Sequence, residues 1–172
     1  MENNNTKYEG FTLSLALVDA LPVLFFGGSS ILIGLLFGSP LFLVGASLIF
    51  LGGLLKVLWK IILAVKNKDI PILNKQMKYT MLTGFGVVVA SVAANFRRID
   101  LRKIGKTVLS LPLLPFLLVF FLGMTAMGVL GKKMDSTKAR SNWIEQGVNG
   151  FSQLALFTGL LLLVLRGRKS RR

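Results

Sequence analysis

Three charged residues lie within the first long apolar stretch of the chain, 11–65, and their types could bind or transfer a proton or a cation. They are Asp19, Lys56 and Lys60. If this stretch folds as a helical hairpin with its turn near residue 38, Asp19 lies level with the helix face that Lys56 and Lys60 share at a spacing of four. We expect a structural ion pair between Asp19 and a lysine. The alternative is a proton- or cation-coupled site, because an acid inside a membrane is a candidate functional group.

A second set of polar residues lies at the start of the last long apolar stretch. Gln146, Asn149 and Gln153 follow one another at spacings that place them on one helix face. Such a face either forms hydrogen bonds to a neighbouring helix or lines a wet path through the membrane. Asn95, at the end of the middle apolar segment, is a candidate partner for it. We expect hydrogen bonding between helices, with a permeation path as the alternative.

The residue types that are absent from the chain exclude several kinds of chemistry. There is no His and no Cys, so disulfides, thiolate catalysis, the usual zinc sites and His-ligated haem are excluded. The seven acidic residues show no spacing typical of acid–base or metal chemistry. We therefore expect no catalytic residue, no metal site and no cofactor, and we interpret the chain as a protein that is not an enzyme.

The elements that must hold these residues are apolar helices long enough to cross a membrane. Hydrophobic residues make up 53% of the 172 residues and charged residues only 16%, which is too apolar for an ordinary soluble domain. A spanning helix needs about 20 apolar residues. The first stretch is long enough for two such helices, and the breaker cluster Gly38-Ser39-Pro40 predicts the turn between them.

The whole chain, 1–172, reads as a single membrane domain in five consecutive parts. These are a polar tail, a first helical hairpin, a basic linker with a middle span, a last helical hairpin and a basic tail, at 1–10, 11–65, 66–106, 107–165 and 166–172. We predict an all-α integral membrane protein, a helical bundle of five transmembrane spans. Because 79–96 is uncharged but only moderately apolar, the alternative is four spans plus one re-entrant or interfacial segment there.

The formal net charge of +14 comes mainly from basic residues that flank the apolar segments. We expect Arg97, Arg98, Arg102 and Lys103 to contact anionic lipid headgroups in the bilayer. Nucleic acid is not an expected partner, because no basic patch lies in a soluble domain. With five spans, the two sides of the membrane carry eleven and ten basic residues, so the positive-inside rule specifies no orientation.

These observations predict a small multi-pass protein of the cell membrane that acts in transport or as a channel. We expect a homo-oligomer or a larger membrane complex, in which several copies build one path. Asp19, Lys56 and Lys60 would supply its charged elements, and Asn149 and Gln153 its polar lining. The alternative is a non-catalytic structural or accessory subunit that binds another membrane protein or anionic lipid. The sequence indicates no substrate.

Overall fold

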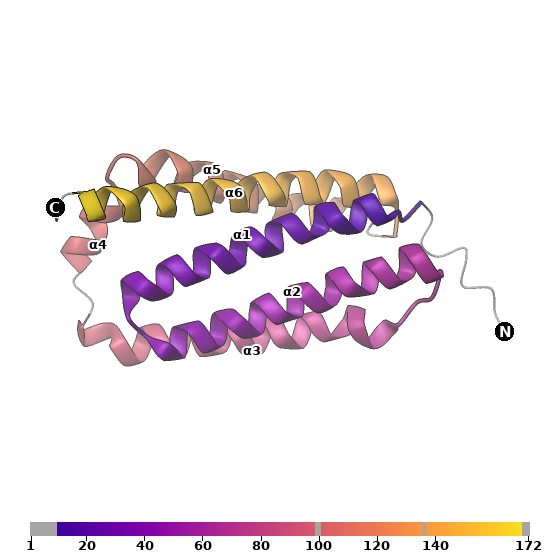
Figure 1. The fold of residues 1–172 in the computed structure, drawn as a ribbon, viewed down its shortest axis with the longest axis horizontal. Coiled ribbons are helices and arrows are strands. Elements are labelled where there is room, and N and C mark those ends of the chain that lie inside the picture. Colours follow the sequence, from indigo (N-terminus) through magenta and orange to yellow (C-terminus); the bar gives the residue numbers. More distant parts are fainter. Residues whose placement is uncertain (1–9, 99–100, 136, 170–172) are drawn as a thin grey trace.

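The computed structural model describes residues 10–98, 101–135 and 137–169, and within these ranges the chain forms helices and no strand. The long helices are α1 (Leu13–Phe37), α2 (Pro40–Lys66), α3 (Pro71–Asn95), α5 (Leu113–Lys133) and α6 (Ala139–Lys169). A 3₁₀ turn, η2 (Phe96–Arg98), and a short helix, α4 (Leu101–Val108), lie between α3 and α5 (Figure 1). Residues 1–9 of the predicted polar tail and 170–172 of the predicted basic tail lie outside the described ranges.

Each of the five long helices is long and apolar enough to span a membrane. Large side chains on their outer faces are exposed, for example Leu35 and Leu82 at 73% each. Such a surface suits contact with lipid rather than with water. The protein is therefore a multi-pass, all-α membrane protein, and the predicted five-span bundle is confirmed. Against the alternative of a re-entrant or interfacial segment at 79–96, α3 is one continuous helix of 25 residues that is long and apolar enough to cross a membrane.

The turn between α1 and α2 is formed by the predicted breaker residues. Gly38 adopts the left-handed conformation, with φ of 63°, and its N–H donates to the carbonyl oxygen of Gly34 at 2.8 Å. Ser39 then caps α2, since its hydroxyl accepts a hydrogen bond from the backbone N–H of Phe42 at 3.4 Å. Pro40 occupies the first turn of α2, where its missing N–H costs nothing. The two helices therefore run antiparallel with a minimal connection.

Several helices outside this hairpin extend beyond the apolar segments of the sequence. The basic linker within 66–106 is much shorter than predicted, because α3 begins at Pro71, a residue whose fixed φ favours the first turn of a helix. Basic residues after α3 lie in η2 and α4. At the other end of the chain, 166–169 of the predicted tail continues α6. In each case charged residues extend a helix beyond its apolar part, which hydropathy alone does not detect.

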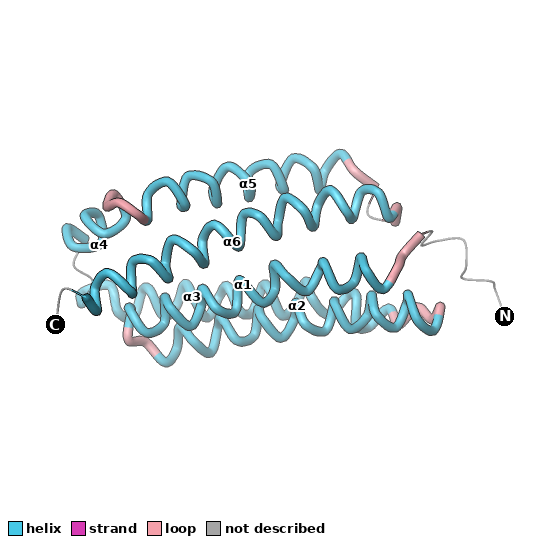
Figure 2. Tube along the Cα trace, turned by 45° about the horizontal axis from the view of Figure 1, so that its top comes forward, coloured by secondary structure: helices cyan, strands magenta, loops and turns pink. Residues whose placement is uncertain are grey.

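The long helices pack in an order that differs from their order in the chain. Helix α1 lies between α2 and α6, α3 packs against α2, and α5 packs against α6 (Figures 1 and 2). Across the bundle the order is therefore α3, α2, α1, α6, α5. Among the described elements, α3 contacts neither α5 nor α6. The first helix thus joins the two parts of the bundle.

Small residues allow two of these helix pairs to approach closely. A Cβ atom added to Gly45 on α2 would lie 2.8 Å from the carbonyl oxygen of Gly84 on α3. Gly123 on α5 lies directly against the side chain of Ser152 on α6. Close backbone approach of this kind is how helices gain van der Waals contact in lipid.

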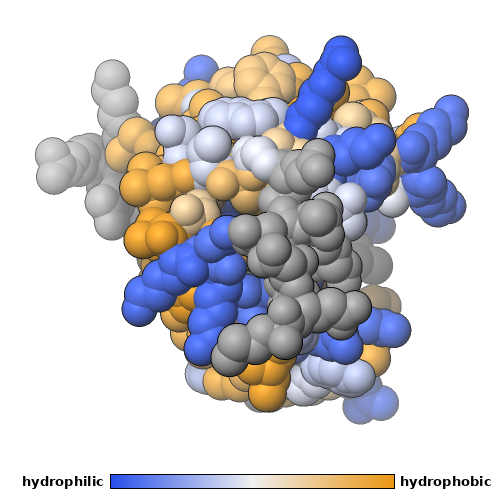
Figure 3. Space-filling view, turned by 90° about the vertical axis from the view of Figure 1, so that its right-hand side faces the viewer, coloured by the Kyte–Doolittle hydropathy of each residue, from blue (hydrophilic) through white to orange (hydrophobic). Residues whose placement is uncertain are grey.

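The connections lie at two opposite ends of the bundle. The start of α1 and the α2–α3 and α5–α6 connections form one end, here called the α2–α3 end (Figure 1). The α1–α2 turn, α4 and the end of α6 form the other, here called the α4 end. Figure 3 looks onto the α2–α3 end and shows hydrophilic side chains gathered there, with hydrophobic side chains around them. This distribution matches helices whose middle parts lie in hydrocarbon.

Candidate functional site

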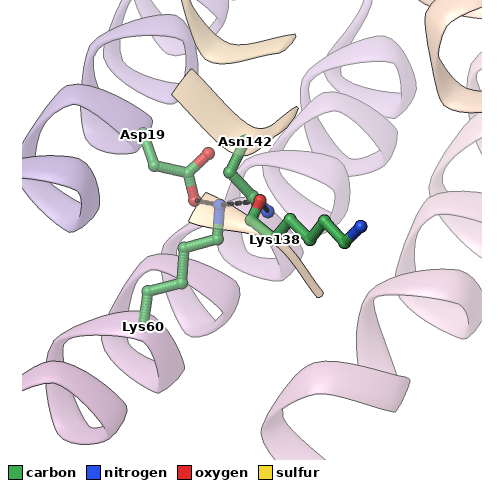
Figure 4. Close-up of polar contacts among 4 residues, drawn as sticks. All are labelled: Asp19, Lys60, Lys138 and Asn142. Carbon is green, nitrogen blue, oxygen red and sulfur yellow. Dashed lines mark hydrogen bonds and ion pairs between the residues drawn. The ribbon is translucent and has the colours of Figure 1, made fainter. Parts of the chain in front are cut away.

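A buried ion pair joins the three central helices near the α2–α3 end. Lys60 Nζ on α2 lies 3.0 Å from Asp19 Oδ2 on α1 (Figure 4). The same ammonium group donates a hydrogen bond to Asn142 Oδ1 on α6 at 3.1 Å. Lys60 is only 2% exposed and Asp19 only 6%. Three helices therefore meet at the ammonium group of Lys60, which is almost completely removed from solvent.

Asn142 is oriented for this role by the first turn of α6. Its side-chain nitrogen donates to the carbonyl oxygen of Lys138 at 3.0 Å, so its side-chain oxygen is turned toward Lys60. Asn142 is not among the residues predicted from the sequence. A signal was present, because Asn142 precedes Gln146 and Gln153 by four and eleven residues and so lies on the same helix face.

The structure brings Asp19 together with Lys60 but not with Lys56. Lys56 is half-buried one helical turn away on α2, and the described contacts include no ion pair between it and Asp19. Its charge repels the Lys60 ammonium group, whereas Glu145 on α6 attracts it. The charge on Lys60 is therefore balanced mainly by Asp19, with a smaller contribution from Glu145.

A buried pair of this kind contributes specificity more than net stability. Removing two charges from water costs several kcal/mol per ion, and their attraction offsets this cost only when the geometry is good. Removing one partner, however, leaves an unbalanced buried charge and costs about 3–5 kcal/mol. The pair thus strongly disfavours any arrangement in which α1, α2 and α6 separate at this level.

Beyond Asn142, the polar face of α6 contains buried groups without partners. Gln146 and Gln153 are each 8% exposed, and the side-chain oxygen of each has no hydrogen-bond partner among the described residues. Gln153 Nε2 makes only a weak contact with Met124 Sδ on α5, at 4.0 Å. Asn149 between them is half-buried, and the hydroxyl of Ser29 on α1 is buried with no hydrogen-bond partner in the described part of the chain. A buried acceptor of this kind costs about 1–3 kcal/mol, so it favours binding of a hydrogen-bond donor such as water.

Asn95 does not join this polar face, so the predicted partnership is wrong. Its side-chain nitrogen donates to the carbonyl oxygen of Ser91 at 2.9 Å and to the hydroxyl of Ser39 at 3.4 Å. The hydroxyls of Ser39 and Ser91 are themselves 2.8 Å apart. Asn95 therefore belongs to a polar contact between α3 and the start of α2, on a helix that does not touch α6.

A second polar contact, not predicted from the sequence, fixes the connection between α2 and α3. The indole N–H of Trp59 donates to Asp69 Oδ1 at 2.8 Å. Trp59 is buried, and the Phe11 ring packs edge-on against it with ring centroids 6.4 Å apart. Because Trp59 directly precedes Lys60 on α2, this contact supports the backbone from which the ammonium group extends.

The basic residues predicted to contact lipid gather at the α4 end. Arg97 in η2 and Arg102 in α4 are exposed. The side chains of Arg98 and Lys103 lie outside the described part of the structure. Arg166, near the end of α6, is also exposed, and its guanidinium group donates to the carbonyl oxygen of Leu111 at 2.9 Å. This contact brings the end of the last helix beside the α4–α5 connection.

Comparison with known proteins identifies no relative, since no protein family, no curated protein and no solved structure matches the chain.

Proposed function

We propose that this protein is a small transport or channel-type protein of the cell membrane, in which a small polar or charged solute moves along the polar face of α6. The observation that carries the proposal is that the side-chain oxygens of Gln146 and Gln153 are buried without partners among the described residues. Buried acceptors inside an apolar bundle are costly unless a donor reaches them. A donor supplied by water or by the solute itself would remove this cost.

The polar face extends part of the way across the membrane. From Asn142 to Gln153 the rise along α6 is about 17 Å at 1.5 Å per residue. A hydrocarbon core is about 30 Å thick. Farther along the same face of α6 come Leu156 and Leu160, of which Leu160 is buried. Hydrophobic constrictions can gate a path by excluding water, and we assign that role to this apolar part.

The ion pair lies at the start of this face and supplies a means of coupling. A proton or cation that binds Asp19 competes with the ammonium group of Lys60. Lys60 also holds Asn142 on α6, so its release would loosen the contact between the three central helices. Binding of a cation would in this way change the contact through which α6 is held. Lys56, one turn before Lys60 on α2, repels the Lys60 ammonium group and so favours its release once Asp19 is neutralised.

The edge helices support assembly with further chains. Among the described long helices, α3 packs only against α2, and α5 packs only against α6. The free sides of both are therefore available to another copy, and we propose a homo-oligomer or a larger membrane complex in which several copies complete the path.

The test is solute flux through liposomes that contain the purified protein. Proton flux is followed with an enclosed pH-sensitive dye, and monovalent ion flux is measured in parallel. The double substitution Asn149→Leu with Gln153→Leu is expected to reduce flux at least tenfold. Thr125→Val is the matched control, because Thr125 is exposed on α5 and its hydroxyl donates to the carbonyl oxygen of Phe121 in its own helix, at 2.8 Å.

Two results would contradict the proposal. Wild-type flux in the folded double variant would show that the polar face of α6 does not line the path. Absence of flux from the wild-type chain, together with its co-purification with a larger membrane protein, would favour the second candidate function, a non-catalytic accessory subunit. The exposed apolar sides of α3 and α5 are compatible with that second function.

A further inference from the structure

Helix α4 has one apolar face and one basic face. Ile104 and Val108 are four residues apart, so they share one side of the helix, and they are 44% and 37% exposed. Arg102 and Lys106 are also four residues apart and exposed. Because two residues turn a helix by about 200°, the basic pair lies opposite the apolar pair. The short helix is therefore strongly amphipathic.

The apolar face of α4 has no helix over it in the described part of the protein. Among the described elements, α4 packs only against α5. The residues that follow it continue the exposed apolar surface, with Leu109 at 69% and Leu111 at 74% exposed. This surface lies at the end of the bundle, where the long helices stop (Figure 1). Amphipathic helices at that depth lie with their apolar face in the boundary between hydrocarbon and headgroups.

The charge around α4 is almost entirely positive and comes from two distant parts of the chain. The contact of Arg166 with Leu111 brings these two parts together. Residues 96–112 and 166–172 contain ten basic residues and one acidic residue in total. The opposite side of the chain carries the other eleven basic residues together with the other six acidic residues, so the two sides differ in their acidic residues and not in their basic ones. The excess of positive charge is therefore concentrated at the α4 end.

We propose that α4 and the adjoining basic residues form a binding surface for anionic phospholipid headgroups. Ile104 and Val108 enter the outer part of the hydrocarbon, and Arg102, Lys106 and Arg166 contact the phosphates. Each basic residue near an anionic surface strengthens binding about fivefold. The α4 end accordingly faces the leaflet that is richer in anionic lipid, which supplies the orientation that the counts of basic residues left undecided. This surface uses none of the residues proposed for transport, so each proposal can fail without the other.

The proposal is tested by measuring how deeply α4 enters the bilayer. The chain has no Cys, so Ile104→Cys provides a unique site for a small environment-sensitive dye. The labelled full-length protein is reconstituted into vesicles of phosphatidylcholine alone, or of phosphatidylcholine with phosphatidylglycerol. We expect a strong blue shift of the dye emission in the anionic vesicles, a weak one in the zwitterionic vesicles, and loss of the difference at high salt.

Charge-removing variants distinguish a specific surface from general attraction. Arg102→Gln with Lys106→Gln should shift the equilibrium between inserted and water-exposed α4 by roughly 30-fold, since two basic residues are lost. Lys132→Gln with Lys133→Gln removes two exposed basic residues at the opposite end of α5 and should leave the emission unchanged. Equal emission in both kinds of vesicle would overturn the role of anionic lipid. Emission typical of a dye in water, in both kinds of vesicle, would show that lipid does not cover the apolar face of α4. That face would then require a protein partner.

Discussion

Asp19→Asn should destabilise the protein more than the loss of an ordinary salt bridge would. The change leaves Lys60 charged and buried beside two amide oxygens, that of the new Asn side chain and that of Asn142 at 3.1 Å, and without the carboxylate that balanced it most directly. An amide oxygen accepts a hydrogen bond but does not neutralise the ammonium group. The converse change, Lys60→Met, leaves the carboxylate of Asp19 buried without a countercharge.

The expected magnitudes follow from the burial of the two groups. Breaking a buried pair costs about 3–5 kcal/mol. Lys60 has a long side chain and is six residues from the end of α2, so in Asp19→Asn it can extend toward the headgroups, and we expect about 3 kcal/mol. Asp19 is short and has no such route, so Lys60→Met should lie near 5 kcal/mol. Asp19→Leu combined with Lys60→Met removes both charges, and the free energy of unfolding of this double variant should lie within about 1 kcal/mol of the wild-type value.

The assay is reversible unfolding in detergent micelles, followed by the intrinsic fluorescence of Trp59, which directly precedes Lys60 on α2, in a Trp143→Phe background that removes the other tryptophan. Lys56→Met is the matched control, because Lys56 lies on the same helix without an ion pair among the described contacts, and it should cost less than about 1 kcal/mol. If the double variant loses the sum of the two single losses, the charges are not coupled. The conclusion that this pair holds the three central helices together would then be refuted.

Two further predictions concern helix packing and the α5–α6 connection. Gly84→Ala should destabilise the protein by about 2 kcal/mol, since the new Cβ would lie 2.8 Å from the carbonyl oxygen of Gly45. Gly86→Ala should stabilise the protein by up to about 1 kcal/mol, since nothing lies within 4 Å of its new Cβ. The same unfolding assay compares the two variants, and equal effects would contradict the α2–α3 contact. Asp135 Oδ1 accepts hydrogen bonds from the Thr137 hydroxyl at 2.7 Å and its backbone N–H at 2.9 Å, which lowers the pKa of Asp135 below its ordinary value of 3.8. The small contribution of the ionised Asp135 carboxylate to stability is therefore present above about pH 4 and is lost as the pH falls through the lowered pKa. Thr137→Val should raise this pKa toward 3.8, measured by the carboxyl ¹³C shift, and an unchanged titration would show that the hydroxyl bond is absent.

Much of the fold could be predicted because hydropathy and helix-breaking residues are local signals. The breaker cluster Gly38-Ser39-Pro40 placed the first turn, and a count of residues from that turn placed Asp19 near Lys60. The helix ends were less predictable. Pro71 starts α3 well before the uncharged segment, and α6 continues past Arg166, because a helix can extend beyond the hydrocarbon.

The packing order could not be predicted, and with it most of the candidate site. Each spanning helix has leucines facing lipid, so hydrophobic periodicity does not identify its neighbours. Asn142 meets Lys60 only because α6 lies beside α1. The residues of α1 and α6 that make this helix contact are more than a hundred positions apart in the chain. For the same reason Asn95 was assigned to the wrong helix pair.

The position of α1 between α2 and α6 has a consequence for how the protein is made. Helix α1 leaves the ribosome before both of its neighbours, and α6 follows it only after α2, α3, α4 and α5. During synthesis the side of α1 that will face α6 has no permanent neighbour, and Asn142 is missing from the contact that Lys60 makes with Asp19. Helix α5 likewise has no packed neighbour until α6 is made, since α6 is its only long neighbour among the described helices. A chain that ends before α6 therefore leaves two helices incompletely packed in the membrane, which gives quality-control proteases a way to distinguish an unfinished product from a finished one.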